Sequence, residues 1–214
     1  MKSETYTVQQ LFQDRRQYRV PFYQRAYVWQ KETQWQPLWD DIREKAEFRI
    51  GGSEPPPHFL GAIVLEPQTK IGLRGVETLN IIDGQQRLTT LQYFLEALAI
   101  HLRKAKSTGL VPLVETCLWN SNPDTMQNPE IEQFKLWPTF RDRSAYQAAI
   151  KSDTLDNLVE SFPDSFTQSG TLRKIGVNHP PAFEAVWFFS KRSTIGWRPK
   201  RPKTMTSPDQ HSKG

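Results

Sequence analysis

The chain has 214 residues, of which 37% are hydrophobic and 24% are charged. This length suits one sizeable domain, alone or with a helical appendage. The longest apolar run, residues 59–65, is far shorter than the roughly 20 residues of a membrane span, and the N-terminus has no signal-peptide pattern. A single cysteine, Cys117, excludes an internal disulfide framework. We therefore expect a cytoplasmic protein that makes no membrane contact.

The positive charge is concentrated at one end of the chain. Residues 190–214 hold seven of the 28 basic residues and one of the 23 acidic residues, so residues 1–189 carry a net charge of −1 although the whole chain carries +5. The body of the protein thus offers no bulk electrostatic argument for nucleic-acid binding. The composition of residues 190–214 predicts a disordered basic tail.

The first predicted elements are a short helix and an extended segment. Thr7 can cap a helix at 8–13, and the aromatic and β-branched residues of 18–29 favour an extended conformation. Alternation along that segment assigns one set of side chains to the core and the other to a surface that could hold a planar or anionic ligand. The core set is Phe22, Ala26 and Val28, and the surface set is Tyr23, Arg25, Tyr27 and Trp29.

Helical periodicity follows at 32–48, where the predicted apolar stripe consists of Trp35, Leu38, Trp39, Ile42 and Ala46. Residues 58–66 have the apolar density of a strand that is buried on both faces, and a second strand is expected at 77–82. After a turn at Asp83 and Gly84, leucines spaced three and four residues apart predict a long helix at 85–104. Beyond it the pattern is mainly helical, with expected helices at 110–119, 144–151, 154–162 and 182–189 and an extended stretch at 134–139.

The turn at Asp83 has the chemistry of an anion site. The first amides of a helix lack backbone partners and lie at the positive end of its dipole. Gly84 lets the backbone approach a ligand, Gln85 and Gln86 add amide donors, and Arg87 adds a planar fork that suits phosphate. Asp83 could hold a magnesium ion or orient a water molecule. The same residues also allow a purely structural interpretation, in which Asp83 and Gln86 form a capping box that stabilises the helix by about 1 kcal/mol.

Four motifs follow one another along the chain: Phe-Tyr-Gln-Arg-Ala-Tyr-Val-Trp at 22–29, Leu-Trp-Asp-Asp-Ile at 38–42, Phe-Leu-Gly-Ala-Ile-Val-Leu at 59–65 and Ile-Asp-Gly-Gln-Gln-Arg-Leu-Thr-Thr-Leu at 82–91. They stand in the order and spacing of the N-terminal domain of the GmrSD restriction family, which the chain resembles. Weaker matches follow at 135–143 and 183–189. The resemblance implies a ParB/sulfiredoxin-like α+β fold, with a small sheet flanked by helices and a helical segment after it. It also implies binding and hydrolysis of a nucleoside triphosphate with Mg²⁺, in a restriction system that defends against phages with modified DNA.

The predicted site follows from the turn and from the resemblance together. We expect Asp83 and Arg87 to be catalytic and Asp41 to face the substrate cleft with Tyr23 and Gln24. The expected nucleotide-binding residues are Gly84, Gln85, Gln86, Arg87 and Arg25. No metal site built from protein side chains alone is expected, because the four histidines are scattered and no cysteine pair exists.

Two departures limit what the resemblance implies. Sulfiredoxin chemistry needs a cysteine in the phosphate turn, where this chain has Gln85 and Gln86, so peroxide repair is not expected. Full-length relatives continue into a nuclease domain with a His-Asn-His-type metal site, and no such pattern is present here. The chain is therefore expected to be a truncated member of the family that at most senses or hydrolyses nucleotide.

The predicted organisation is a ParB-like core at 1–105, a mainly helical extension at 106–189 and the basic tail at 190–214, which is expected not to be family sequence. An apolar stripe interrupted near residue 190 would need a protein partner or a second copy to cover it. Three alternatives stay open: a non-enzymatic ParB-like module that binds DNA, nuclease activity in the ParB-like domain itself, and an inactive truncated gene product.

Overall fold

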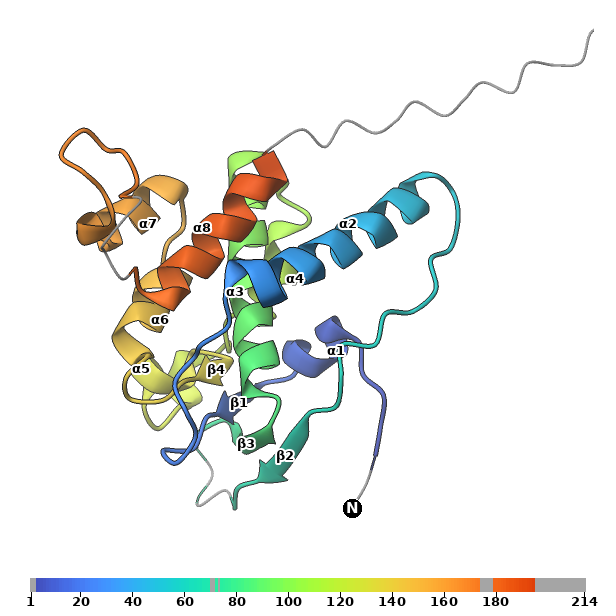
Figure 1. Ribbon diagram of the computed structural model, residues 1–214. Coiled ribbons are helices and arrows are strands. Elements are labelled where there is room, and N and C mark those ends of the chain that lie inside the picture. The colour runs from blue at the N-terminus through green and yellow to red at the C-terminus, as the bar shows by residue number, and fades with distance from the viewer. Residues whose placement is uncertain (1–2, 70–71, 73, 174–178, 195–214) are drawn as a thin grey trace, which may run out of the picture.

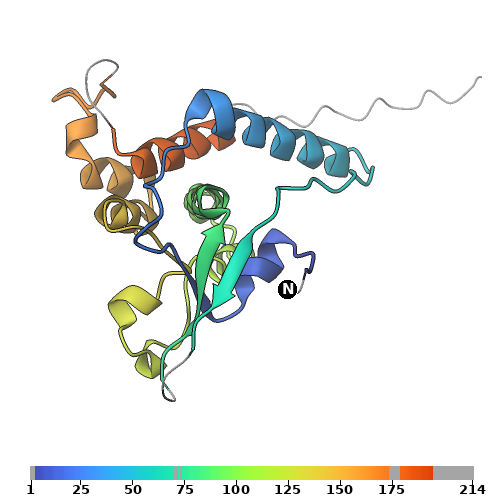
Figure 2. The ribbon, with the colours of Figure 1, turned by 60° about the horizontal axis from the view of Figure 1, so that its bottom comes forward.

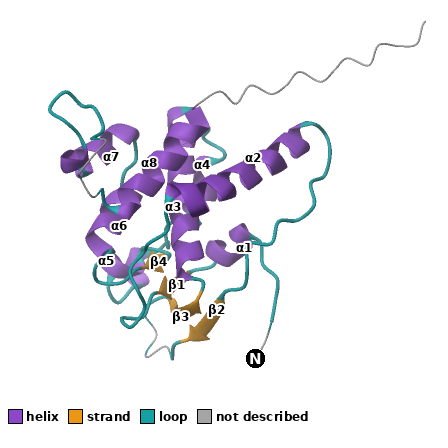
Figure 3. Ribbon diagram, viewed as in Figure 1, coloured by secondary structure: helices purple, strands orange, loops and turns teal. Residues whose placement is uncertain are grey.

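The computed structural model describes residues 3–69, 72, 74–173 and 179–194, and it shows an α+β protein built on a small mixed sheet (Figure 1, Figure 3). This confirms the predicted fold class. The strands are β1 (Arg16–Arg19), β2 (Val64–Pro67), β3 (Glu77–Asp83) and β4 (Leu136–Trp137). The helices are α1 (Val8–Gln13), α2 (Gln36–Ile50), α3 (Gln85–Lys104), α4 (Val111–Glu115), α5 (Pro129–Glu132), α6 (Arg143–Ile150), α7 (Leu155–Ser161) and α8 (Pro181–Thr194). Three single turns complete the set, a π-helical η1 (Lys31–Trp35) and the 3₁₀ turns η2 (Pro123–Thr125) and η3 (Pro163–Ser165).

The sheet has the order β2-β3-β1-β4, with β1 parallel to both β3 and β4 and with β2 antiparallel to β3. Tyr18 lies opposite Leu79 and Leu136, and all three side chains are buried. Strand residues alternate between faces. The neighbouring positions on β1, β3 and β4 therefore belong to the other face, which is more polar. Since the parallel strands end at one edge, the turn after β3 and the segment after β1 begin close together.

Helix α3 packs against the inner face of the sheet and is seen nearly end-on in Figure 2. Helix α8 packs on α3, where Phe94 and Phe189 form an edge-to-face pair with ring centroids 5.5 Å apart. Because two packed neighbours cover α3, it is buried over most of its circumference, including the fully buried Glu96. Residues from the predicted core at 1–105 and from the predicted extension thus lie in one hydrophobic cluster, and the extension supplies β4 to the sheet.

The prediction for 18–29 was wrong beyond the first residues. Strand β1 ends at Arg19, and the following segment is irregular. Phe22, predicted to be core, is 95% exposed, Val28 is also exposed, and Tyr27, predicted to face a ligand, is only 6% exposed. Alternation fails because none of the strands that the structure describes pairs with residues 25–28. Their backbone is bonded instead by side chains from α3 and from the loop before α6.

The strand expected at 58–66 was also wrong in extent and in burial. Strand β2 begins only at Val64 and lies at an edge of the sheet, which leaves one of its sides without a strand partner. Phe59 is 80% exposed. The apolar density of this stretch therefore reflects contact with other loops and helices, not burial between two layers.

The helix predicted at 32–48 forms as η1 followed by α2, but only Trp35 of its apolar stripe is fully buried. No residue of α2 is buried, Ala46 is exposed, and the end of the helix projects to the right of the sheet in Figure 1. The tail predicted from residue 190 was wrong for residues 190–194, because α8 continues through Thr194. The rest of that prediction falls on residues 195–214, outside the described residues. In the described part of the chain, no helix is long and apolar enough to cross a membrane.

Candidate functional site

The turn between β3 and α3 depends on Gly84. This residue has φ 97°, in the left-handed region, and a Cβ atom there would lie 3.0 Å from Ile63 Cγ1. Only glycine meets both conditions without strain. Gly84 is the N-cap of α3, and no side chain caps the helix, so the capping-box interpretation of Asp83 and Gln86 was wrong. The first amides of α3 are left without side-chain partners, as an anion site at a helix N-terminus requires.

The side chains of Gln85 and Gln86 bind the backbone of residues 25–28. Gln85 Nε2 donates to the carbonyl of Arg25 at 2.6 Å, and Gln86 Nε2 donates to that of Ala26 at 3.1 Å. Gln86 Oε1 accepts from the amide of Val28 at 2.9 Å. Both glutamines are buried. They therefore position the segment that carries Arg25, and in this arrangement it is the backbone amides of the turn that remain for a ligand.

Arg87 is held from two sides at the start of α3. Its Nη1 donates to the carbonyl of Ala62, and its Nη2 lies 3.8 Å from Asp83 Oδ2. The side chain of Arg87 is 30% exposed, whereas that of Asp83 is 65% exposed. Gly61 lies against the guanidinium, since a Cβ atom at that position would be 3.1 Å from Arg87 Cζ. The guanidinium is thus fixed in place and still reaches solvent.

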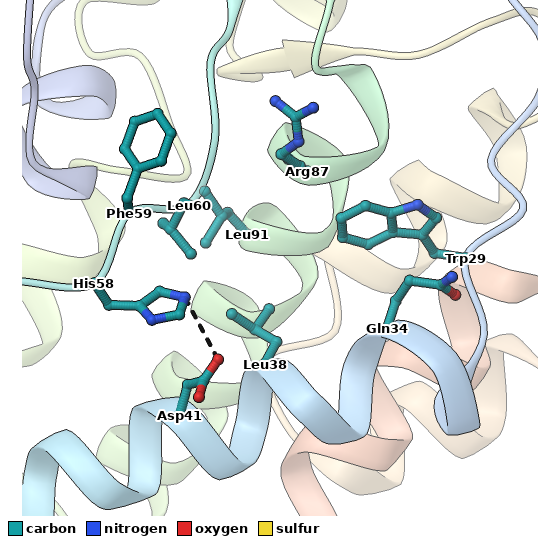
Figure 4. Close-up of a pocket in the computed structure, with 9 residues that line it drawn as sticks. All are labelled: Trp29, Gln34, Leu38, Asp41, His58, Phe59, Leu60, Arg87 and Leu91. Atoms are coloured by element: carbon teal, nitrogen blue, oxygen red, sulfur yellow. Dashed lines mark ion pairs between the residues drawn. The ribbon is translucent and has the colours of Figure 1, made fainter.

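Arg87 also lines a hollow between α2 and α3, which we call the α2–α3 hollow (Figure 4). Its volume is about 180 Å³, and Trp29 and Phe59 lie on opposite sides of it. At the end away from Arg87, His58 Nε2 lies 3.4 Å from Asp41 Oδ2. The other lining residues are Gln34, Leu38, Leu60 and Leu91. One end of the hollow is therefore cationic, and its walls are apolar and aromatic.

The structure brings together only part of the predicted site. Arg87 and Asp41 both line the α2–α3 hollow, and Asp83 adjoins Arg87. Tyr23 and Arg25 are exposed beside the turn and do not line the hollow. Gln24 is anchored there as well, because its Nε2 donates to the carbonyl of Ile82 at 2.9 Å.

Sequence reasoning missed His58 and Phe59 as parts of this site. Phe59 was assigned to a buried strand, and His58 was set aside because it has no histidine or cysteine neighbour in sequence. The motif at 59–65 was a usable signal, since it places Phe59 and Gly61 a few residues apart, one in the wall of the hollow and the other against Arg87.

Fold and site together define a small α+β domain with a strand–glycine turn–helix site that presents an arginine to a hollow. Comparison with known families identifies that class more closely. The family model of the GmrSD restriction endonuclease N-terminal domain matches residues 8–182, so the chain belongs to this family, as the four motifs predicted. No match was found among curated proteins.

Proposed function

We propose that this chain is the nucleotide-binding domain of a restriction system and binds a nucleoside triphosphate at the N-terminal end of α3. One observation carries the proposal: Arg87 adjoins the uncapped first turn of α3 and also lines the α2–α3 hollow. A ligand that reaches from the turn into the hollow would place phosphates against amides and a guanidinium, and an apolar group against Trp29 and Phe59.

The phosphates are assigned to the turn. The amides of Gly84, Gln85, Gln86 and Arg87 are placed at the positive end of the helix dipole, and a guanidinium fork can bind a phosphate through two parallel hydrogen bonds. Arg25 has an exposed side chain on a segment that Gln85 and Gln86 hold beside the turn. We assign Arg25 to the outermost phosphate, with Tyr23 and Gln24 at the rim.

The nucleoside is assigned to the α2–α3 hollow. A volume of about 180 Å³ is below the roughly 300–1,000 Å³ of pockets that enclose a whole ligand, so the hollow suits one ring system and not a whole nucleotide. Trp29 and Phe59 offer ring faces for a base, and base–aromatic stacking contributes about 1–3 kcal/mol. Asp41 and His58, at the far end, supply polar groups for the edge of a base or for a ribose hydroxyl.

Hydrolysis is assigned to Asp83. Its carboxylate is mostly exposed, and Arg87 is its ion-pair partner at 3.8 Å. No group of three metal-ligating side chains exists among the described residues. Mg²⁺ takes one or two carboxylates and completes its shell with phosphate oxygens and water, so Asp83 alone could be its protein ligand. When bound, such an ion would neutralise developing phosphate charge, and Asp83 would hold it or orient the attacking water. In the restriction system this step would control a DNA-cutting domain that acts on modified DNA.

Calorimetric titration of the chain with ATP and with GTP, in Mg²⁺, tests the proposal. Arg87→Gln should weaken triphosphate binding by about 1.5–3 kcal/mol, the scale of a charge-assisted contact. The matched control is Arg49→Gln, which removes an exposed arginine on α2 far from the turn and should leave binding unchanged. Asp83→Asn should keep binding and lose phosphate release. Equal affinity in the wild type and in Arg87→Gln would exclude the site.

A second candidate function is a non-enzymatic module that binds DNA. The observation that favours it is the exposed tip after β1. There Phe22 and Tyr23 form an edge-to-face pair whose ring centroids lie 5.5 Å apart, and Arg25 follows two residues later. Exposed rings beside an arginine suit stacking on bases together with phosphate contact. Salt-dependent DNA binding that is lost in Phe22→Ala, in a chain that releases no phosphate from any triphosphate, would favour this function over the first.

A further inference from the structure

The face of the sheet opposite α3 carries a second hollow, which has a volume of about 270 Å³ and, unlike the α2–α3 hollow, is mostly polar. Strand pairing places Arg19 of β1 beside Asn80 of β3 and beside Trp137 of β4. Thr78 lies two residues before Asn80 on β3 and therefore on the same face. We call these four residues and the space over them the outer sheet face. Most of its strand positions are polar, whereas the inner face carries Tyr18, Leu79 and Leu136. Arg19, Thr78 and Asn80 line this hollow together with Arg74 and Glu132, so it presents polar and charged groups to a ligand.

Arg19 is partly buried on this face and forms no ion pair within 4.0 Å among the described residues, although the Glu132 carboxylate lies near enough to act on its charge. Its Nε donates to Gln17 Oε1 at 2.8 Å, and in the described part of the chain its two terminal nitrogens have no hydrogen-bond or ion-pair partner. Burial lowers the pKa of Arg19; the Glu132 carboxylate opposes this effect and the Arg143 guanidinium adds to it. Trp137 connects the two arginines, because it is the strand neighbour of Arg19 and its ring centroid lies 5.2 Å from Arg143 Cζ, and two nearby guanidinium groups are stabilised by an anion between or beside them.

Arg143 is held at the same face by aromatic rings. Its Cζ lies 5.2 Å from the centroid of Trp137 and 5.7 Å from that of Phe140, which is 82% exposed. Its Nε makes a long contact of 3.4 Å with the carbonyl of Pro138. Cation–π contact orients a guanidinium without neutralising it, because the ring carries no net charge.

The nearby carboxylates already have other partners. Glu132 accepts from the amides of Val76 at 3.0 Å, Asn128 at 3.2 Å and Gln127 at 3.3 Å. Glu66, at the edge of the sheet, accepts from Gln68 Nε2 at 3.0 Å and from Asn80 Nδ2 at 3.4 Å. Neither forms an ion pair with Arg19 or Arg143 among the described residues. Glu132 lines the hollow and offsets part of the charge of Arg19, but Arg19 and Arg74 line it as well, so the charged side chains around the hollow keep a net positive charge.

We propose that the outer sheet face is an anion site that receives a phosphate group, separate from the turn at Gly84. Two guanidinium forks with the Thr78 hydroxyl and the Asn80 amide supply donors for several oxygens of one tetrahedral anion, and phosphate matches guanidinium geometry better than a point charge does. The exposed ring of Phe140 beside Arg143 would stack on a base. The phosphate thus belongs to a nucleotide or to a nucleic-acid backbone, two sources of one chemistry.

The test uses the arginine Nε–Hε signals in NMR spectra of the full chain, titrated with sodium phosphate and, at matched ionic strength, with sodium acetate. Phosphate should shift the Arg19 and Arg143 signals saturably, and acetate should act at least tenfold more weakly. Arg19→Gln should weaken phosphate binding roughly tenfold, the scale of one charge-assisted contact. Arg143→Gln is the second variant, in case Arg19→Gln fails to fold. Equal shifts with acetate, or no saturation with phosphate, would overturn the proposal.

The Arg87→Gln variant separates this inference from the proposed function. It should keep the phosphate response of Arg19 and Arg143 even if triphosphate binding at the turn is lost, and loss of both responses would overturn an independent site. In that variant, ATP and a short single-stranded oligodeoxynucleotide are then tested as competitors of phosphate. Competition by either one identifies the source of the phosphate. Phe140→Ala should weaken the binding of that competitor and leave the binding of free phosphate unchanged. Competition by neither would overturn the assignment to a phosphorylated ligand.

Discussion

Gln86 joins the first turn of α3 to Val28 on a segment 58 residues earlier in the chain. Its Oε1 accepts from the Val28 amide at 2.9 Å, and its Nε2 donates to the neighbouring carbonyl of Ala26 at 3.1 Å. This one side chain thereby bonds the backbone amide of Val28 and the carbonyl of Ala26, which in a sheet would be bonded by a neighbouring strand. The connection places Tyr27 in the core and Trp29 in the wall of the α2–α3 hollow.

Loss of this connection should destabilise the fold. Gln86→Ala leaves a partly buried amide and a carbonyl without partners, so we expect the free energy of unfolding to fall by about 1–3 kcal/mol in urea titrations. Gln68→Ala, which removes an exposed amide from a loop, is the control and should stay within about 0.5 kcal/mol of the wild type. Equal stability of the two variants would contradict the structural role of Gln86.

Neighbouring aromatic residues of the 22–29 motif should differ sharply in their effect on stability. Tyr27 is buried, its ring centroid lies 5.3 Å from that of Tyr93, and its hydroxyl contacts Thr90 and Trp35. Tyr27→Ala should therefore lower the free energy of unfolding by about 3–5 kcal/mol. Phe22→Ala should change it by less than about 0.5 kcal/mol, since that ring is in solvent. Thermal or urea unfolding would reveal the reverse order if the strand alternation were correct after all.

Gly84 should tolerate no side chain. Its left-handed backbone and the nearby Ile63 side chain together predict that Gly84→Ala destabilises the protein by about 1–3 kcal/mol. Gly109→Ala is the matched control, because Gly109 has an ordinary φ and a Cβ atom added there would have no neighbour within 4 Å. That variant should be neutral or more stable by up to about 1 kcal/mol. A Gly84→Ala protein as stable as the control would show that the turn can relax.

Stability should depend on pH through Glu96. Burial raises the pKa of this carboxyl to about 8, and Arg103, whose Nη1 lies 2.9 Å from Glu96 Oε1, opposes the shift only in part. The folded state then keeps a proton that the unfolded state releases near its ordinary pKa of 4.5, so stability falls as the pH rises from about 4.5 through 8.

Glu96→Gln removes this titration and keeps the size of the side chain. Between pH 5 and 8.5 the wild type should lose stability relative to the variant by an amount on the order of 2–4 kcal/mol, measured by urea unfolding at each pH. All titratable groups other than residue 96 are the same in the two proteins, so the difference between their curves reports on Glu96. Parallel curves across this range would mean that the buried carboxyl is already ionised.

The elements that depend on local pattern could be predicted from the sequence. The leucine spacing predicted the bounds of α3, and a strand followed by Asp83 and Gly84 predicted the turn between β3 and α3. The family followed from four motifs in register. Helical periodicity and turn chemistry arise from residues a few positions apart, so they are present before any tertiary contact forms.

The tertiary structure alone decided where the extended segments lie and what the polar side chains bind. Residues 25–28 have the composition of a strand, yet their partners are Gln85, Gln86 and Asp142, which no local pattern connects to them. The α2–α3 hollow combines three separate segments, and Arg143 comes near Arg19 only because Trp137, on whose ring Arg143 packs, is the neighbour of Arg19 in the sheet. Such sites depend on contacts between distant parts of the chain. Alternation specifies which side a residue takes only when a second strand is there to define the sides.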